Sequence, residues 1–400
     1  MIKQNSVPAA SKVNTLLLIL LGAIAAMTPL AIDMYLPAMP NIAKDLAVAE
    51  SAVQMTLSVY IGAFAVGQLI HGPLADSFGR KPVLLIGIFF FAIASVLSAM
   101  VNSIETLMLA RGFQGFAGAA VAVIIQAIVR DMFDREDFTR VMSFVTLIMT
   151  IAPLVGPLLG GHISVWLGWR AIFIILTVIA ILIGIAVLRK IPETLSEKNK
   201  QSLRFGVVTR NYLSLFKDPV AMGLILCSAF SFSGMFAFLT AGSFVYIDVY
   251  GVKPDHFGYF FGFNIVAMMV MTSLNGRLVK KVGSHFMLRL GLAIQFLAGV
   301  GLFVSLLIGP EFWQLVLFIA LYISTLSTIG SNASGLLLSH YPKMAGTASS
   351  LSGSLRFGIS SLVGGLVAVF PASITLSMVA MMAFCAVASA LCYYRFGRTA

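Results

Sequence analysis

The sequence predicts an all-α polytopic membrane protein, with twelve membrane-spanning helices arranged as two bundles of six. Of its 400 residues, 59% are apolar and 10% are charged, whereas a soluble domain has about 45–50% apolar and about 25% charged residues. No soluble fold buries so much apolar surface, which excludes a soluble enzyme, a disordered chain and a coiled coil. Because a helix needs about 20 residues to cross a bilayer, the chain has room for about ten to fourteen spans.

Twelve apolar segments of spanning length follow one another along the chain. They are residues 15–37, 51–71, 81–101, 104–129, 139–163, 167–188, 219–246, 255–276, 286–308, 311–339, 344–369 and 372–394. The longest polar stretch, 189–217, carries seven basic residues and separates the sixth segment from the seventh. We therefore expect a six-helix bundle over 1–188, a cytoplasmic linker over 189–217 and a second six-helix bundle over 218–400. The first apolar run is too long for a cleaved signal peptide.

The basic residues predict the orientation of the chain. Of the 26 lysines and arginines, 21 fall on the side that holds the N-terminus, three on the other side and two, Arg111 and Arg356, within spans. Because cytoplasmic loops carry the excess of basic residues, both termini are predicted to be cytoplasmic. The net charge of +11 then reflects topology and contact with anionic lipid, not nucleic acid binding. Three cysteines without a CxxC pair, and five histidines at the ends of apolar runs, predict neither disulfides nor a metal site.

An internal repeat favours two related halves. Four residues around the loop between the second and third span recur 204 positions later, around the corresponding loop of the second half. Gly72, Leu74, Gly79 and Leu84 match Gly276, Leu278, Gly283 and Leu288.

The first of these loops, residues 72–82, contains Gly72, Asp76, Gly79 and Arg80. Its glycines allow a tight turn or a close backbone approach. Asp76 is spaced to pair with Arg80, or to lie at the positive N-terminus of a neighbouring helix. The second copy has Lys280 where Asp76 stands, so any contact made by Asp76 is asymmetric between the halves.

The fifth span carries Gly156, Pro157, Gly160 and Gly161. A proline within a helix removes a backbone hydrogen bond and kinks the helix. Gly156 and Gly160 lie one turn apart, which gives a flat face for close packing in lipid. These residues by themselves therefore predict a bent and closely packed helix.

Together these motifs resemble those of the major facilitator superfamily. Residues 72–82 are similar to its loop signature, and Arg111 with the small residues after it is similar to its fourth-span signature. Gly156, Pro157, Gly160 and Gly161 resemble the signature of its drug:proton antiporters. Further similarities, to the bicyclomycin-resistance (Bcr/CflA) subfamily, lie at residues 32–38, 169–170, 192–194, 345–350 and 356–358.

The resemblance covers residues 15–396 and implies the major facilitator fold, alternating access and proton-driven export of drugs from the bacterial inner membrane. It also implies a monomer whose partners are small drugs, protons and lipid, with the proton gradient as energy source and no bound cofactor. In the family, the residue at Asp76 contacts the eleventh span and holds the outward-facing state.

Two ionisable side chains are predicted to lie deep in the membrane at the same level. At 1.5 Å per residue, Asp33 on the first span and Arg111 on the fourth both lie about 27 Å from the cytoplasmic side. Such groups are costly in a bilayer and mark functional sites. In the resembled fold both spans line the central cavity, so we expect Asp33 and Arg111 to be coupled directly or through water. Snorkelling of Arg111 to the outer interface is the alternative.

Coupling to Arg111 suggests how Asp33 would work. Burial favours the neutral form of a carboxyl, and a nearby arginine favours the charged form. Access to water or an arriving substrate could therefore shift the balance, and we expect Asp33 to carry the proton. Two alternatives stay open: Asp33 anchors the substrate, or it has no transport role and is a structural partner of Arg111 or a helix-end residue near the headgroups.

The wall of the cavity is predicted from polar and aromatic residues within spans. Arg356 lies near the bilayer midplane, where an idle arginine is unexpected. Two cations against one carboxylate argue for neutral or zwitterionic drugs over lipophilic cations. Further candidates for the substrate cavity are Tyr35, Tyr60, Asn264, Asn332 and Phe236.

Other functions remain to be weighed against drug export. An exporter of an amino-acid-like metabolite, with drugs as incidental cargo, has the same sequence features. An uptake symporter is disfavoured by the resemblance of the fifth span to antiporters. An intramembrane enzyme would need several deep carboxylates and histidines, and the chain has one deep carboxylate. A purely structural or sensory protein would tolerate the loss of Asp33.

Overall fold

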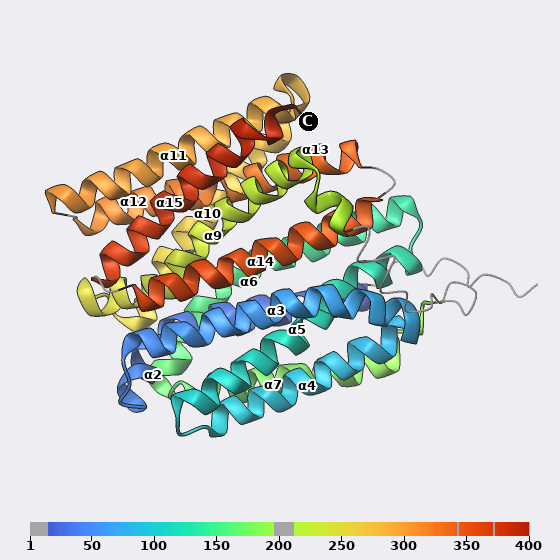
Figure 1. Cartoon of the computed structure of the whole chain (residues 1–400). Helices are drawn as coiled ribbons and strands as arrows, with labels where there is room; N and C mark the ends of the chain where they lie inside the picture. Colours follow the sequence, from blue (N-terminus) through green and yellow to red (C-terminus); the bar gives the residue numbers. More distant parts are fainter. Residues whose placement is uncertain (1–14, 196–211, 310, 342–343, 371–372, 400) are drawn as a thin grey trace, which may run out of the picture.

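The computed structural model describes residues 15–195, 212–309, 311–341, 344–370 and 373–399. Twelve helical segments in this part of the chain are long and apolar enough to cross a membrane, which confirms the predicted number. Figure 1 shows them running roughly parallel, with α1 to α7 on one side of the molecule and α9 to α15 on the other. Most of the predicted linker, residues 196–211, lies outside the described residues.

The first half begins with a broken helix and continues with five long ones. Its elements are α1 (Thr15–Asp33), η1 (Leu36–Ala38), α2 (Met39–Asp45), α3 (Glu50–Phe78), α4 (Arg80–Met100), α5 (Ile104–Met132), α6 (Arg135–Trp166) and α7 (Arg170–Lys190). The second half also contains six spans, and its fourth span is divided into α12 and α13. Its elements are α9 (Pro219–Phe244), η3 (Val245–Val249), α10 (Pro254–Val282), α11 (Ser284–Ile308), α12 (Phe312–Ser324), α13 (Leu326–His340), α14 (Ala345–Val369), α15 (Ile374–Arg395) and η5 (Gly397–Thr399).

The internal repeat appears as two matching turns. Gly79 precedes α4 and Gly283 precedes α11, and their φ angles are +109° and +84°. This backbone region is accessible to glycine and strained for other residues. The glycine at the same point of each half therefore serves the same purpose, a sharp reversal between consecutive spans.

The predicted first span, 15–37, is interrupted near its end. Pro37 has no N–H to donate to the carbonyl of Asp33, and its ring crowds that carbonyl. The α-helix accordingly ends at Asp33. The N–H of Tyr35 then donates to the carbonyl of Ile32 and not to that of Ala31. The break leaves the Ala31 carbonyl available to another donor.

The two halves touch along α3 and α14, which lie side by side at the centre of Figure 1. The Ser361 hydroxyl donates to the Ser58 carbonyl (2.7 Å), and the Ser354 hydroxyl donates to the Ala65 carbonyl (3.2 Å). Small residues at these positions let the two backbones approach closely.

A second contact between the halves joins α6 and α10. A Cβ added to Gly258 would lie 2.7 Å from Leu158, and one added to Gly161 would lie 3.1 Å from the Cα of Asp255. Beyond these helices, Lys44 at the end of α2 pairs with Asp248 in η3 at 2.9 Å. This pair lies at the end of the molecule where α2 meets α3.

We call the end that holds Arg80, Lys190 and Lys281 the basic end, and the other the opposite end. The contacts between the halves run from the middle of α3 and α14 toward the opposite end. On the basic side of these contacts, α10 is exposed at Val270 and Leu274, and α6 is exposed at Leu147. The contacts between the halves named above therefore lie in the middle of the molecule and at the opposite end.

Candidate functional site

Arg111 of α5 is fully buried among aromatic rings of three other helical segments. Its guanidinium lies 4.2 Å from the ring centre of Tyr60 on α3, 4.6 Å from Tyr35 after α1 and 5.8 Å from Phe173 on α7. Cations are attracted to the faces of such rings, most strongly where water is excluded. Tyr35 and Tyr60, predicted as cavity residues, thus surround an arginine that does not snorkel to the surface in this structure.

One hydrogen bond ties this arginine to the broken first span. Nη1 of Arg111 donates to the carbonyl of Ala31 at 3.2 Å. This is the carbonyl that the break after Asp33 leaves without its helical donor. Nε and Nη2 of Arg111 are buried and have no hydrogen-bond partner among the described residues, so two donors remain available to a carboxylate, water or substrate.

A polar network that the sequence analysis missed supports Arg111. Nη1 also donates to Oε1 of Gln114, one turn along α5. Nε2 of Gln114 donates to the Ser95 hydroxyl of α4 at 2.7 Å, and that hydroxyl donates to the Phe91 carbonyl at 2.8 Å. These hydrogen bonds hold Nη1 of Arg111 and the Gln114 amide in place, while Nε and Nη2 of Arg111 have no partner among the described residues. The spacing of three residues between Arg111 and Gln114 was the available signal.

Asp33 lies at the last position of α1 and is 5% exposed. None of the described lysines, arginines or histidines lies within 4 Å of its carboxylate oxygens. Arg111 reaches α1 two residues before Asp33, so the two groups lie at neighbouring levels along α1, while their common depth in the membrane stays a prediction. Direct pairing does not occur in this conformation, and coupling through water stays a prediction.

The glycines of α6 hold the turn that carries Asp33. A Cβ added to Gly156 would lie 2.8 Å from the Cβ of Asp33, and one added to Gly160 would lie 2.6 Å from the Cα of Met34. Real Cβ atoms do not approach other carbon atoms so closely. The flat face predicted for α6 therefore packs on the backbone at the end of α1, while Gly161 packs against α10 of the other half.

Arg356 of α14 lies among phenylalanines at the boundary of the halves. Its guanidinium is 5.4 Å from the ring centre of Phe232 on α9, and its Nε is buried without a hydrogen-bond partner among the described residues. The predicted cavity residue Phe236 belongs to the same aromatic group, with its ring centre 5.3 Å from that of Phe232.

The two candidate asparagines lie in different surroundings. Asn264 of α10 is 1% exposed, and neither amide atom has a hydrogen-bond partner among the described residues. Asn332 of α13 donates to Oδ1 of Asn275 and to the Thr328 carbonyl, both at 2.8 Å. Asn332 thus joins α13 to α10, whereas Asn264 has hydrogen-bonding capacity to offer a ligand.

The loop at residues 72–82, at the basic end, forms an ion-paired cluster with Asp131 of α5, and Glu193 after α7 joins it through backbone hydrogen bonds. Arg80 pairs with Asp76 and, at 3.3 Å, with Asp131 of α5. The Glu193 carboxylate accepts the backbone N–H groups of Arg80 (3.0 Å) and Lys81 (3.2 Å). Gly79 leaves space for that carboxylate, and Gly72 is loosely packed, with its nearest neighbour 3.7 Å from an added Cβ. Asp131 was missed by the sequence analysis.

Most of this chain is similar in sequence to a known family and to a named relative. The sequence profile of the Major Facilitator Superfamily matches residues 21–365. A bicyclomycin resistance protein homolog from Haemophilus influenzae is 42% identical over 383 residues, which is 96% of each chain. The chain belongs to the Major Facilitator Superfamily.

Other superfamily members named for drug resistance are also similar. A chloramphenicol resistance protein from Pseudomonas aeruginosa is 32% identical over 74% of this chain and 69% of its own. Multidrug resistance protein D of Escherichia coli is 26% identical over 90% of each chain. Among solved structures, a bacterial homolog of the human lysosomal transporter Spinster, inward-facing and occupied, superposes with a TM-score of 0.77 at 16% identity, covering 96% of this chain and 97% of the other.

Membership of the superfamily makes this chain a multi-pass bacterial membrane transporter and not an enzyme. Its relatives are efflux proteins of drug resistance, which supports a role in drug efflux. Within the described residues, no three His, Cys, Asp or Glu side chains lie close enough together to hold a metal ion.

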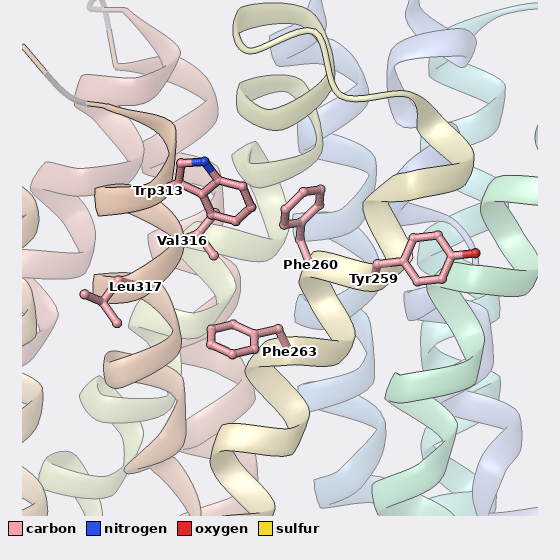
Figure 2. A pocket seen from close by; sticks show the side chains of 6 residues that line it. All are labelled: Tyr259, Phe260, Phe263, Trp313, Val316 and Leu317. Atoms are coloured by element: carbon pink, nitrogen blue, oxygen red, sulfur yellow. The ribbon is translucent and has the colours of Figure 1, made fainter.

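A separate apolar pocket of about 370 Å³ lies on the transporter between α10 and α12, away from these groups. Figure 2 shows Trp313, Phe260 and Phe263 converging across the gap between the two helices, with Tyr259 pointing away from them. None of the six lining residues is a predicted site residue, and none is charged. Its exposed rings suit contact with hydrocarbon more than recognition of an ion.

Proposed function

We propose that this transporter exports small neutral or zwitterionic antibiotics in exchange for protons, across the bacterial inner membrane. In this proposal both termini are cytoplasmic, the basic end faces the cytoplasm, and the bundles 1–188 and 218–400 move about the central site. Bicyclomycin and chloramphenicol, for which two relatives are named, are the first substrates to test.

A single observation carries the proton-coupling part of the proposal. Among the described residues, Asp33 is a buried carboxyl with no cation within 4 Å, and Arg111 nearby has two nitrogens, Nε and Nη2, without a protein acceptor. A carboxyl in such a place is stable when protonated, because an isolated charge is costly away from water. The same carboxylate becomes stable when water or the free donors of Arg111 reach it.

The break after α1 supplies the element that moves. The turn at Asp33 and Met34 rests on Gly156 and Gly160, and Arg111 is fastened to Ala31 just before it. A shift of α1 against α6 changes the separation of Asp33 and Arg111. In our proposal Asp33 takes up a proton when the site is open to the opposite end. It releases the proton toward the basic end, where the drug binds, and the drug leaves as the site reopens outward.

The proposal is tested with purified protein in liposomes. An imposed pH gradient drives flux of radiolabelled chloramphenicol, and drug exchange without a gradient is measured in the same preparation. We compare the wild type with Asp33→Asn, and with Glu105→Gln as a control, because Glu105 is exposed at the start of α5.

We expect Asp33→Asn to abolish gradient-driven flux while exchange continues, and Glu105→Gln to behave as wild type. Gradient-driven flux at the wild-type level in Asp33→Asn would refute Asp33 as the proton carrier. If the wild type moves neither chloramphenicol nor bicyclomycin, drug export itself is refuted and an amino-acid-like metabolite becomes the substrate to test.

A further inference from the structure

Four phenylalanines form one aromatic cluster across the boundary between the halves. The ring of Phe357 on α14 lies 4.7 Å from that of Phe64 on α3, at an interplanar angle of 71°. It also lies 5.4 Å from Phe232 and 6.3 Å from Phe236, both on α9. All three contacts are edge-to-face, the arrangement that aromatic pairs prefer. The contact between Phe64 and Phe357 is the member of the cluster that joins the two halves.

Arg356 adds an unused hydrogen-bond donor to the edge of this cluster. Its guanidinium lies over Phe232, the ring that also contacts Phe357. Its Nε is buried without a hydrogen-bond partner, and no described carboxylate lies within 4 Å of its nitrogens. Opposite, Gly330 of α13 has no side chain to fill the space, since a Cβ there would lie 3.9 Å from Nη2 of Arg356.

A buried arginine nitrogen without a protein acceptor indicates that an acceptor from outside the protein binds there. Buried polar groups in native structures are almost always hydrogen-bonded, so an orphaned donor indicates a missing partner. That partner cannot be a cation, because no carboxylate of the described residues lies within 4 Å of the Arg356 nitrogens to offset the charge. Arg111 differs in that its Nη1 already donates to Ala31 and Gln114, whereas its Nε and Nη2, like Nε of Arg356, have no partner among the described residues.

We infer that Phe64, Phe232, Phe357 and Arg356 form the subsite that selects the drug, an inference that rests on the proposed export function. The subsite takes an aromatic molecule carrying a neutral or anionic acceptor, such as a carbonyl, nitro or carboxylate group. The aromatic ring of the drug enters between Phe64 and Phe357, and its acceptor receives the N–H of Arg356.

This binding mode connects recognition to movement. A ring that enters between Phe64 and Phe357 replaces a contact between the halves with two contacts to the drug. The bound drug thereby changes the free-energy difference between the two arrangements of the halves, which any transported substrate must do. Lipophilic cations would fit the rings but would be repelled by Arg356.

Equilibrium binding to the purified full-length protein, without a pH gradient, tests the subsite. The probes are radiolabelled chloramphenicol, which has a nitroaryl ring and an amide carbonyl, and radiolabelled tetraphenylphosphonium, an aromatic cation. The variants are Arg356→Gln, Arg356→Lys, Phe357→Leu and, as a matched control, Phe230→Leu. Phe230 is also on α9, but its ring contacts only the exposed Phe384 among the described aromatic residues, at 6.2 Å.

We expect Arg356→Gln to weaken chloramphenicol binding about tenfold or more, since a hydrogen bond to a charged group is lost. Tetraphenylphosphonium binding should stay equal or become tighter. Arg356→Lys should recover part of the chloramphenicol affinity, Phe357→Leu should weaken chloramphenicol binding severalfold, and Phe230→Leu should match the wild type.

Equal effects of Arg356→Gln on both probes, or no effect on either, would overturn the inference. So would a wild type that binds the cation more tightly than chloramphenicol. Thermal unfolding of each variant shows whether a loss of binding reflects a loss of fold. Export of chloramphenicol with unchanged binding in Arg356→Gln refutes the subsite alone, whereas selective binding without export refutes the export function alone.

Discussion

Replacement of Gly160 by alanine tests whether close packing between α6 and the end of α1 is required. The added methyl carbon would lie 2.6 Å from the Cα and 2.7 Å from the carbonyl carbon of Met34. Carbon atoms in contact prefer about 3.5–4.0 Å, so the two segments must separate by about 1 Å. The obstacle is backbone, which has no rotamer to change.

The expected cost is that of overpacking a well-packed interior, about 1–3 kcal/mol. Gly276→Ala is the matched control, because Gly276 lies within a helix and nothing lies within 4 Å of an added Cβ. That substitution should stabilise α10 by about 0.5–1 kcal/mol. Thermal unfolding of the purified proteins in detergent measures both effects, and gradient-driven chloramphenicol flux measures the consequence for Asp33.

We expect Gly160→Ala to unfold at a lower temperature than the wild type and to lose gradient-driven flux. Gly276→Ala should unfold at an equal or higher temperature and keep its flux. The reasoning is refuted if Gly160→Ala has the stability and flux of the wild type, because the turn at Asp33 and Met34 would then tolerate displacement from α6.

Three further predictions concern ionic contacts at the two ends of the molecule. Lys44→Glu should break the ion pair with Asp248 and loosen the contact between the halves at the opposite end, while the free energy of unfolding changes by less than about 1 kcal/mol because the pair is exposed. Distances between spin labels on α3 and α14 should lengthen at that end. The exchanged pair Lys44→Asp with Asp248→Lys should restore these distances. Glu193→Gln should cost about 1 kcal/mol by removing the carboxylate from the first N–H groups of α4, seen as a lower unfolding temperature that Glu105→Gln does not share. Burial raises the pKa of Asp218, but hydrogen bonds from Tyr341 and the α9 backbone outweigh burial and hold this pKa below its usual value. The contribution of the Asp218 carboxylate to stability is therefore complete at neutral pH and is lost as the pH falls through the acidic range. Asp218→Asn should lower the unfolding temperature at pH 7, and an equal lowering at pH 3 would contradict this.

The number of spans was predictable because hydropathy is a local property of the chain. The interruption after Asp33 was not predicted, although Pro37 was visible, since apolar side chains continue through it. The second interruption, between α12 and α13, lies at Thr325, whose hydroxyl donates to the Tyr322 carbonyl. Hydropathy does not register such changes in backbone hydrogen bonding.

The candidate site was predictable as a set of residues but not as a set of contacts. Asp33, Arg111, Tyr35 and Tyr60 stood out because polar groups are rare in apolar spans. Their arrangement depends on how α1, α3 and α5 pack, and residue types alone do not give that packing. The sequence offered Asp33 as the partner of Arg111, whereas the acceptors in this conformation are the main-chain carbonyl of Ala31 and the side-chain carbonyl of Gln114.

The Ala31 carbonyl has a consequence for how this site changes in evolution. Any amino acid at position 31 supplies the same carbonyl oxygen, so selection on the environment of Arg111 does not constrain the residue type at position 31. Selection acts instead on Pro37, because this proline ends the helix and so leaves the Ala31 carbonyl oxygen without a helical donor. A lineage that replaced Pro37 would let the helix continue and occupy that carbonyl. We therefore expect Pro37 and Arg111 to be gained and lost together, although their side chains need never touch.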